Sequence, residues 1–199
     1  MPEQDPTPTS TGEQAPRSVV LGPGPVFLRW TPASAEEYPE LVAEIAVFDA
    51  GEREAAKQAA SWLRERSLLV PAESVTRLLL DNGHLVGFYA LASGATELTR
   101  SQRRALGASD RRTQPATLLT QIARDIRAPD GTGSQLLQHA WAIAQRGADE
   151  IAATVLAVDP YDSQTAEMWV NHWGFHDSAG PGPGGQEQRL WIPLASASS

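Results

Sequence analysis

The sequence predicts an α/β (α+β) fold in which helices flank one mixed central β-sheet. Between residues 117 and 158, an apolar strand, a Gly-containing turn, an amphipathic helix and a second apolar strand follow one another, which is the order of a parallel crossover. Upstream, Asn82-Gly83 separates two apolar runs and indicates an antiparallel hairpin, because both turn residues adopt positive φ. A sheet with both kinds of pair is mixed, and its expected order is β-α-α-β-β-β-α-β-α-β.

The chain of 199 residues is long enough for one domain with a full core and flanking tails. Residues 1–25 are rich in Pro, Thr, Ser, Gln and Gly and have almost no apolar content before Val19. Such a segment cannot offset the entropy of ordering, so we expect it to be disordered, and we expect the same of residues 195–199. The folded domain is therefore predicted over residues 26–194.

The composition excludes several classes of function. The chain has no cysteine, so it has neither disulfides nor thiolate chemistry. His172 and His176 are four residues apart, but Gly174 between them is expected to end a helix, so we predict no metal site. No apolar run reaches membrane-spanning length, and the N-terminus lacks the basic and apolar segments of a signal peptide. The expected location is cytoplasmic.

The net charge of −8 favours solubility and disfavours nucleic acid as a partner, because binding to phosphates needs clustered Lys and Arg. One short segment departs from this balance, with Arg103, Arg104, Arg111 and Arg112 close together in sequence. We interpret it as a solvated loop.

The first elements follow from caps and periodicity. Val26–Trp30 is expected to form a strand, and Thr31 can cap the helix that follows, with a proline at its first position. That helix is predicted over Ala33–Val47. A second helix, over Glu52–Arg66, places alanines and Leu63 along one apolar stripe.

The hairpin strands are predicted over Val75–Leu80 and His84–Leu91. The polar segment Ser93–Gln114 is long for a simple loop, so it is either partly helical, over Glu97–Leu106, or a functional excursion.

The second half of the chain is expected to contain a strand (Thr117–Ala123), a Pro/Gly turn (Ala128–Gly133), a helix (Gly133–Arg146) and a strand (Ile151–Val158). A strand that turns through glycines into a helix suits a phosphate group, since unpaired N–H groups and the helix dipole face the ligand.

The last helix has Asp162 or Ser163 as its cap and ends at Gly174. A Gly/Pro loop (Gly180–Gly185) and a final strand (Gln188–Leu194) complete the predicted domain.

This order resembles the GNAT fold of acyl-CoA N-acyltransferases, over roughly residues 26–194. His84–Leu91, with its Val-Gly pair, is similar to the family's third strand. Gly131-x-Gly133, followed by Leu136-Leu137, is similar to the pyrophosphate loop and the start of its helix. Ala166–Phe175 is similar to the closing helix with its Gly-Phe ending.

A further segment, Phe48-Asp49-Ala50-Gly51-Glu52, followed by Trp62-Leu63, resembles the opening of the GNAT toxin branch, whose members acetylate aminoacyl-tRNA.

The resemblance implies a site for acetyl-CoA, as co-substrate, in a splay between the fourth strand (Thr117–Ala123) and the fifth (Ile151–Val158). Main-chain groups near Ile122 and Arg124 are then expected to bind the pantetheine arm. The pyrophosphate is expected on the amides of Gly131, Thr132, Gly133 and Ser134. Catalysis in this family is largely the positioning of a neutral amine against the thioester, helped by a base and a general acid.

The chain departs from the family pattern in the pyrophosphate loop. Ala128 stands where the family has a long polar residue, Pro129 has no N–H to donate, and Asp130 adds a negative charge beside the expected diphosphate. Each change is expected to weaken binding of the co-substrate.

The closing helix has Val170 where the family usually has the tyrosine that protonates the leaving thiolate. Tyr161, at the end of the fifth strand, is either a substitute for that acid or a tyrosine of a surface loop. Asp159 is either a base or a turn residue.

Three hypotheses follow. In the first, the protein transfers an acetyl group from acetyl-CoA to a primary amine of an unknown acceptor. In the second, it is a catalytically silent GNAT-fold module that binds a partner. In the third, it is a toxin that acetylates aminoacyl-tRNA. The acceptor, an antitoxin or other partner, and the oligomeric state, a dimer included, stay open.

Overall fold

A computed structural model describes residues 24–178 and 189–194. The predicted tails, apart from Gly24 and Pro25, and the predicted Gly180–Gly185 loop lie outside these residues. The elements in chain order are β1 (Pro25–Trp30), α1 (Pro32–Glu37), α2 (Pro39–Ala46), α3 (Glu54–Arg66), β2 (Val75–Asp81), β3 (His84–Glu97), α4 (Arg100–Ala105), β4 (Thr113–Arg124), α5 (Thr132–Ile151), β5 (Val155–Val158), α6 (Ser163–Trp173), β6 (His176–Asp177) and β7 (Leu190–Pro193).

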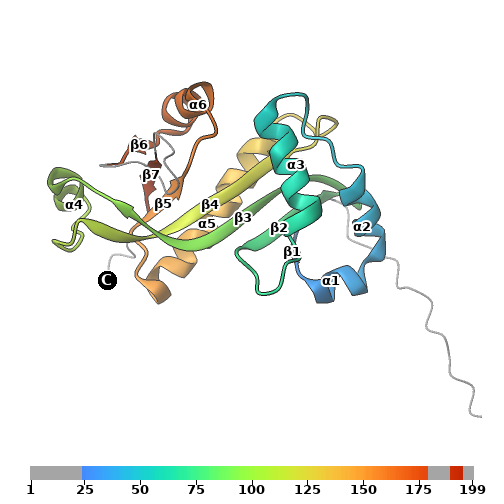
Figure 1. Cartoon of the computed structure of the whole chain (residues 1–199), viewed down its shortest axis with the longest axis horizontal. Helices are drawn as coiled ribbons and strands as arrows, with labels where there is room; N and C mark the ends of the chain where they lie inside the picture. Colours follow the sequence, from blue (N-terminus) through green and yellow to red (C-terminus); the bar gives the residue numbers. More distant parts are fainter. Residues whose placement is uncertain (1–23, 179–188, 195–199) are drawn as a thin grey trace, which may run out of the picture.

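The described strands form one mixed sheet in the order β1-β2-β3-β4-β5-β7-β6, with helices on both faces (Figure 1). The α5 helix covers one face, where Leu136, Leu137 and Ala140 pack against Leu79 and Tyr89 of the strands. The helices α1 to α3 cover the other face over a separate core. That core includes Trp30, Leu41, Phe48, Leu63 and Phe88. The predicted fold class is confirmed.

The hairpin at Asn82-Gly83 is confirmed. Asn82 has φ 50° and Gly83 has φ 83°, as a turn with two positive φ values requires. The flanking β2 and β3 pair in antiparallel register, with Asp81 opposite His84. The expected helical part of the polar segment is α4, at the tip of the long β3–β4 arm (Figure 1).

Two of the predicted helices differ most from those observed. The predicted helix Ala33–Val47 is divided into α1 and α2 at Pro39, which has no N–H for a helical bond and disfavours the α conformation at Tyr38. The α5 helix continues past Arg146 to Ile151, because Ala148 is buried against the sheet and extends the apolar stripe by another turn. The strand expected over Ile151–Val158 therefore begins only at Val155.

The two strands predicted to be parallel neighbours, β4 and β5, are paired in the sheet and then separate. The β4 and β5 strands pair in parallel from Ala116–Val155 to Leu119–Val158. The β4 strand then continues to Arg124 beside β3 alone. Its register with β3 shifts at Thr120, an extra residue that forms a β-bulge where the pairing with β5 ends. One edge of β4 is thus left open beyond this point.

Close packing between α5 and the sheet depends on Gly87 of β3. An ideal Cβ built on Gly87 would lie 2.8 Å from Leu136 Cδ1 and 3.0 Å from the main-chain oxygen of Ala123. A side chain here would push the first turns of α5 away from the open end of β4. The Val-Gly pair therefore positions the helix N-terminus that the next subsection describes.

We predict that Gly87→Ala lowers the free energy of unfolding by about 1–3 kcal/mol, because the added methyl group overpacks this contact. Urea unfolding measures the change. The control is Gly147→Ala, in the interior of α5, where an added Cβ meets nothing within 4 Å. The free energy of unfolding of the control should equal that of the parent or exceed it by up to about 1 kcal/mol. Equal stabilities for the two variants would contradict this account of the packing.

Candidate functional site

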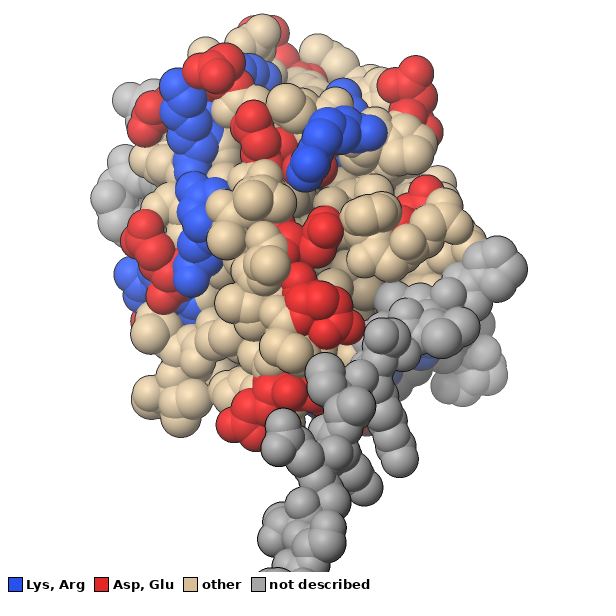
Figure 2. All heavy atoms as spheres, turned by 90° about the vertical axis from the view of Figure 1, so that its right-hand side faces the viewer, with Lys and Arg blue, Asp and Glu red and all other residues tan. Residues whose placement is uncertain are grey.

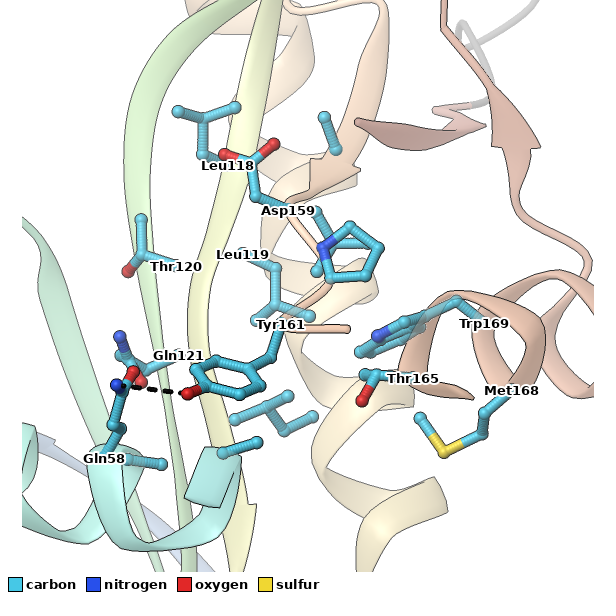
Figure 3. A pocket seen from close by; sticks show the side chains of 16 residues that line it. Gln58, Leu118, Leu119, Thr120, Gln121, Asp159, Tyr161, Thr165, Met168 and Trp169 are labelled. Carbon is cyan, nitrogen blue, oxygen red and sulfur yellow. Dashed lines mark hydrogen bonds between the residues drawn. The ribbon is translucent and has the colours of Figure 1, made fainter. Parts of the chain in front are cut away.

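A cavity of about 340 Å³ lies where β4 and β5 separate (Figure 3). The α3 helix lines one side with Ala55, Gln58 and Ala59, and α6 lines another with Thr165, Met168 and Trp169. The wall between them comes from β4, over residues 118–122, and from the segment that leaves β5, over residues 157–161. The cavity is thus a direct product of the splayed strands.

The open edge of β4 presents main-chain groups to this side. The N–H of Asp125 donates to the carbonyl of Val86 at 2.9 Å, so the main chain of Asp125 faces β3. Main-chain groups alternate in direction along an antiparallel ladder, so Ala123 faces β3 as well, whereas Ile122 and Arg124 face the open edge. The side chain of Ile122 also lines the cavity. This geometry suits the predicted role of these two residues.

The α5 helix begins without a side-chain cap. Gly131 is its N-cap residue, with φ 86°, a left-handed conformation that favours glycine. The amides of Gly133 and Ser134 have no hydrogen-bond partner within the described part of the chain, as expected for the first turn of a helix. An anion is a suitable partner for such groups.

Thr132, also predicted to hold the pyrophosphate, is engaged within the turn. It is buried, its N–H donates to the carbonyl of Pro129 at 3.3 Å, and its hydroxyl donates to the same oxygen at 2.7 Å. The amides of Gly131, Gly133 and Ser134 are the more accessible members of the predicted set. Asp130, at the turn before them, is exposed.

A buried carboxylate fixes the loop between β4 and α5. Asp125, whose side chain is 1% exposed, pairs with Arg127 through distances of 2.7 and 2.8 Å. It also accepts from the N–H of Asp49 at 3.1 Å, and the carbonyl of Asp49 accepts from the N–H of Ile126 at 2.8 Å. The Phe48–Glu52 segment is therefore bonded directly to the loop that precedes the helix N-terminus.

The pKa of Asp125 reflects opposing causes. Burial disfavours its charged form, but hydrogen bonds from Arg127 and from the N–H of Asp49 outweigh burial and lower the pKa from 3.8 to about 2. The charged carboxylate is thus part of the folded loop at neutral pH.

The predicted base, Asp159, is held in an ion pair. Its two oxygens accept from Nε and Nη2 of Arg189 at 2.6 and 2.5 Å, and the Arg189 side chain is only 7% exposed. Arg189 Nη1 also donates to the carbonyl of Ala95, which ties the end of β5 to the β3–β4 arm. In Figure 3, Asp159 points toward Leu118 and away from Tyr161. These contacts favour a structural role for Asp159.

The predicted acid, Tyr161, lines the cavity with its hydroxyl toward Gln58 of α3 (Figure 3), and it is 46% exposed. Its hydroxyl accepts from Gln58 Nε2 at 3.5 Å, which leaves the phenolic proton free for another acceptor. Val170 of α6, where the family usually has a tyrosine, is 39% exposed and is not among the residues that line the cavity.

Sequence reasoning missed Gln58, Arg189 and the buried Asp125. No local pattern marks them, because each is defined by a partner distant in the sequence or by burial that depends on the tertiary structure. No group of three or more His, Asp or Glu side chains among residues 24–178 and 189–194 is placed to hold a metal ion. None of the helices described here is long and apolar enough to span a membrane.

No protein-family model and no curated protein sequence matches this chain. Solved structures do. AtaT complexed with acetyl-methionyl-tRNAfMet superposes with a TM-score of 0.63 at 15% identity, over 85% of this chain and 94% of that chain. A variant of KacT superposes with a TM-score of 0.63 at 16% identity, over 86% of this chain and 95% of that chain. AtaTR bound with acetyl-CoA superposes with a TM-score of 0.60 at 17% identity, over 86% of this chain and 94% of that chain. The chain therefore shares the fold of these structures, and the predicted resemblance is confirmed for the fold.

We predict that Asp125→Asn destabilises the fold by about 2 kcal/mol at neutral pH, the equivalent of the lowered pKa. A carboxyl group whose pKa is lower in the folded state stabilises the fold at pH values above its unfolded-state pKa. This stabilisation is lost as the pH falls through the folded-state pKa. The parent should therefore lose stability relative to the variant between about pH 5 and pH 2. Urea unfolding at several pH values measures both. A constant difference across this range would contradict the assignment.

Proposed function

We propose that the protein is an N-acetyltransferase that transfers an acetyl group from acetyl-CoA to a primary amine. The observation that carries the proposal is the open edge of β4, which begins at the cavity and runs on to Arg124, ahead of the start of α5. That start has no side-chain cap, and the amides of Gly133 and Ser134 have no partner among the described residues. A long ligand with a diphosphate in its middle and an acyl thioester at one end fits this arrangement.

In this proposal the diphosphate binds at the start of α5, where free N–H groups and the helix dipole favour negative charge. The pantetheine arm then extends β4 by bonding to the main chain of Ile122 and Arg124. Asp130 opposes the diphosphate, at a cost on the order of 1 kcal/mol that salt reduces. Binding is therefore expected to be weak for a protein of this fold.

The reaction needs little covalent help from the protein. The lone pair of a neutral amine attacks the thioester carbonyl, the C–S bond breaks, and the amine nitrogen loses a proton while the thiolate gains one. Holding the two reactants in the cavity supplies most of the acceleration. Tyr161 is the proposed donor to the thiolate, because its hydroxyl lies in the cavity and its proton is not used by Gln58.

A second candidate concerns the acceptor, which is then the α-amino group of an aminoacyl-tRNA. Two observations favour it. The Phe48–Glu52 segment, similar to the toxin branch, is bonded to the loop at the proposed site. The similar structures include AtaT complexed with acetyl-methionyl-tRNAfMet and AtaT bound to the C-terminus of its antitoxin AtaR.

The charge of the surface bears on this candidate. On the face drawn in Figure 2, Lys and Arg side chains form a column toward one margin and a second group in the upper part, with Asp and Glu side chains between and below them. Such interspersed charge gives no broad basic surface on this face for RNA. The acceptor is therefore proposed only as a primary amine.

The test of the site is binding of acetyl-CoA by calorimetry to the parent and to Gly133→Asp. The added carboxylate should remove measurable binding by repelling the diphosphate. It should leave the unfolding temperature unchanged, because a Cβ at Gly133 meets nothing within 4 Å. The matched control is Gly133→Asn, which has the same size without the charge and should bind more tightly than the Asp variant.

Two outcomes would overturn the proposal. Undiminished binding in both Gly133 variants would place the co-substrate elsewhere. Failure of the parent to bind acetyl-CoA would favour the silent, partner-binding module.

For catalysis, Tyr161→Phe should lower kcat by about a hundredfold with little change in KM, because the hydroxyl acts on the leaving group. Tyr38→Phe is the control, since the Tyr38 hydroxyl bonds to Glu37 on the surface and lines no part of the cavity. Acetyl transfer to a panel of primary amines measures both. An unchanged kcat in Tyr161→Phe would assign proton transfer to another group.

A further inference from the structure

A second cavity, of about 560 Å³, lies on the face of the sheet that α5 covers. The α5 helix lines it with Ile143, Ala144 and Gly147, and the strands and the loop before β2 line it with Leu91 and several polar residues. The polar residues are Arg29, Arg77, Glu73, Ser74, Ser93 and Thr117. None of these residues lines the cavity proposed for acetyl-CoA.

Two arginines of this cavity lie directly opposite each other. Arg29 of β1 pairs in register with Arg77 of β2. Phe27 and Leu79 lie two residues from Arg29 and Arg77 on their strands and also pair in register. Both belong to the core beneath α5. Side chains two residues apart share a face, so both arginines point to the α5 side. Like charges opposite each other across a strand pair destabilise a sheet.

Among the described residues, no acidic side chain forms an ion pair with either arginine. Neither Arg29 nor Arg77 makes a side-chain hydrogen bond or ion pair within residues 24–178 and 189–194. Glu73, the one acid that lines the cavity, accepts from Arg66 at 2.8 and 2.9 Å. Two guanidinium groups therefore face one cavity, and the carboxylate that lines it is paired with Arg66 and not with either of them.

The surroundings add to the positive potential. Tyr89, opposite Arg77 on β3, has its hydroxyl 2.7 Å from His139 Nδ1 of α5. Burial lowers the pKa of His139, and the charges of Arg77 and Arg146 lower it further. Arg146 lies two turns after His139 on the same helix face. The charges of Arg77 and Arg146 thus act on the same side of α5, and together with burial they favour the neutral imidazole.

We propose that this second cavity binds a phosphate group through Arg29 and Arg77. A guanidinium group presents a planar fork of donors that matches phosphate oxygens, and two such groups balance a dianion. The hydroxyls of Ser74, Ser93 and Thr117 supply further donors at the wall. The bound phosphate replaces the repulsion between the arginines with two charge-assisted contacts.

The test is an NMR titration of the full chain with inorganic phosphate. The Nε–Hε signals of Arg29 and Arg77 and the amide of Ser93 should shift together. Arg77→Gln should weaken the response at Ser93 about tenfold, the loss of one charge-assisted contact, and leave any response at Gly133 and Ser134 unchanged. Arg111→Gln, an exposed arginine in the loop after α4, is the control and should behave as the parent.

A second measurement separates binding from a structural role. Without phosphate, Arg77→Gln should unfold at the same or a higher temperature than the parent, because it removes the like-charge pair. Phosphate should then raise the unfolding temperature of the parent more than that of the variant. No phosphate response at Ser93, or an equal response in parent and Arg77→Gln, would overturn the proposal.

A third titration, with a short single-stranded RNA, distinguishes a phosphate of a nucleic-acid backbone from that of a small ligand. Binding more than about tenfold tighter than that of inorganic phosphate, and weakened in Arg77→Gln, would assign the cavity to a nucleic-acid backbone. Equal or weaker binding would assign it to a small phosphorylated ligand. Both outcomes retain the phosphate site.

Discussion

The separation of β4 from β5 after Leu119 and Val158 is the constraint on which the rest of the site depends. A parallel pair normally continues until one strand ends, and here β5 ends while β4 runs on to Arg124. The bulge at Thr120 coincides with this point and bends β4 locally. The result is an edge of main-chain donors and acceptors without a strand partner, which a protein tolerates at low cost only if water or a ligand satisfies it.

The helix α5 depends on the same end of β4. Gly87 allows Leu136 to approach the sheet, and the buried Asp125 fixes the loop between strand and helix. Asp125 accepts from Arg127 and from Asp49, so the loop after α2 is held to the loop before α5. A site for a long ligand can thus be positioned by packing and hydrogen bonds while most of its ligand contacts come from main-chain groups.

Those parts of the fold that depend on local chemistry could be predicted from the sequence. Asn82-Gly83 favours a turn with positive φ at both residues, and the order strand, Gly turn, helix, strand predicts a parallel crossover. The break at Pro39 and the extra turn at Ala148 were missed, because a proline is also compatible with a helix start and because burial of an alanine depends on what packs against it. The ion pair of Asp159 with Arg189 joins residues far apart in the chain, and no spacing rule predicts it. It also gives Asp159 a contact that a free catalytic base would not have.

The central claim, that the open β4 edge and the start of α5 bind acetyl-CoA, is tested most directly by hydrogen–deuterium exchange of the full chain with and without this ligand. Within the described residues the amides of Gly133 and Ser134 lack a hydrogen-bond partner, and the main-chain groups of Ile122 and Arg124 face the open edge of β4. We predict that acetyl-CoA slows exchange in peptides that cover residues 120–124 and 131–135. Exchange in the β2–β3 hairpin should not change. Unchanged exchange in both peptides at saturating acetyl-CoA, or protection confined to other segments, would contradict this claim.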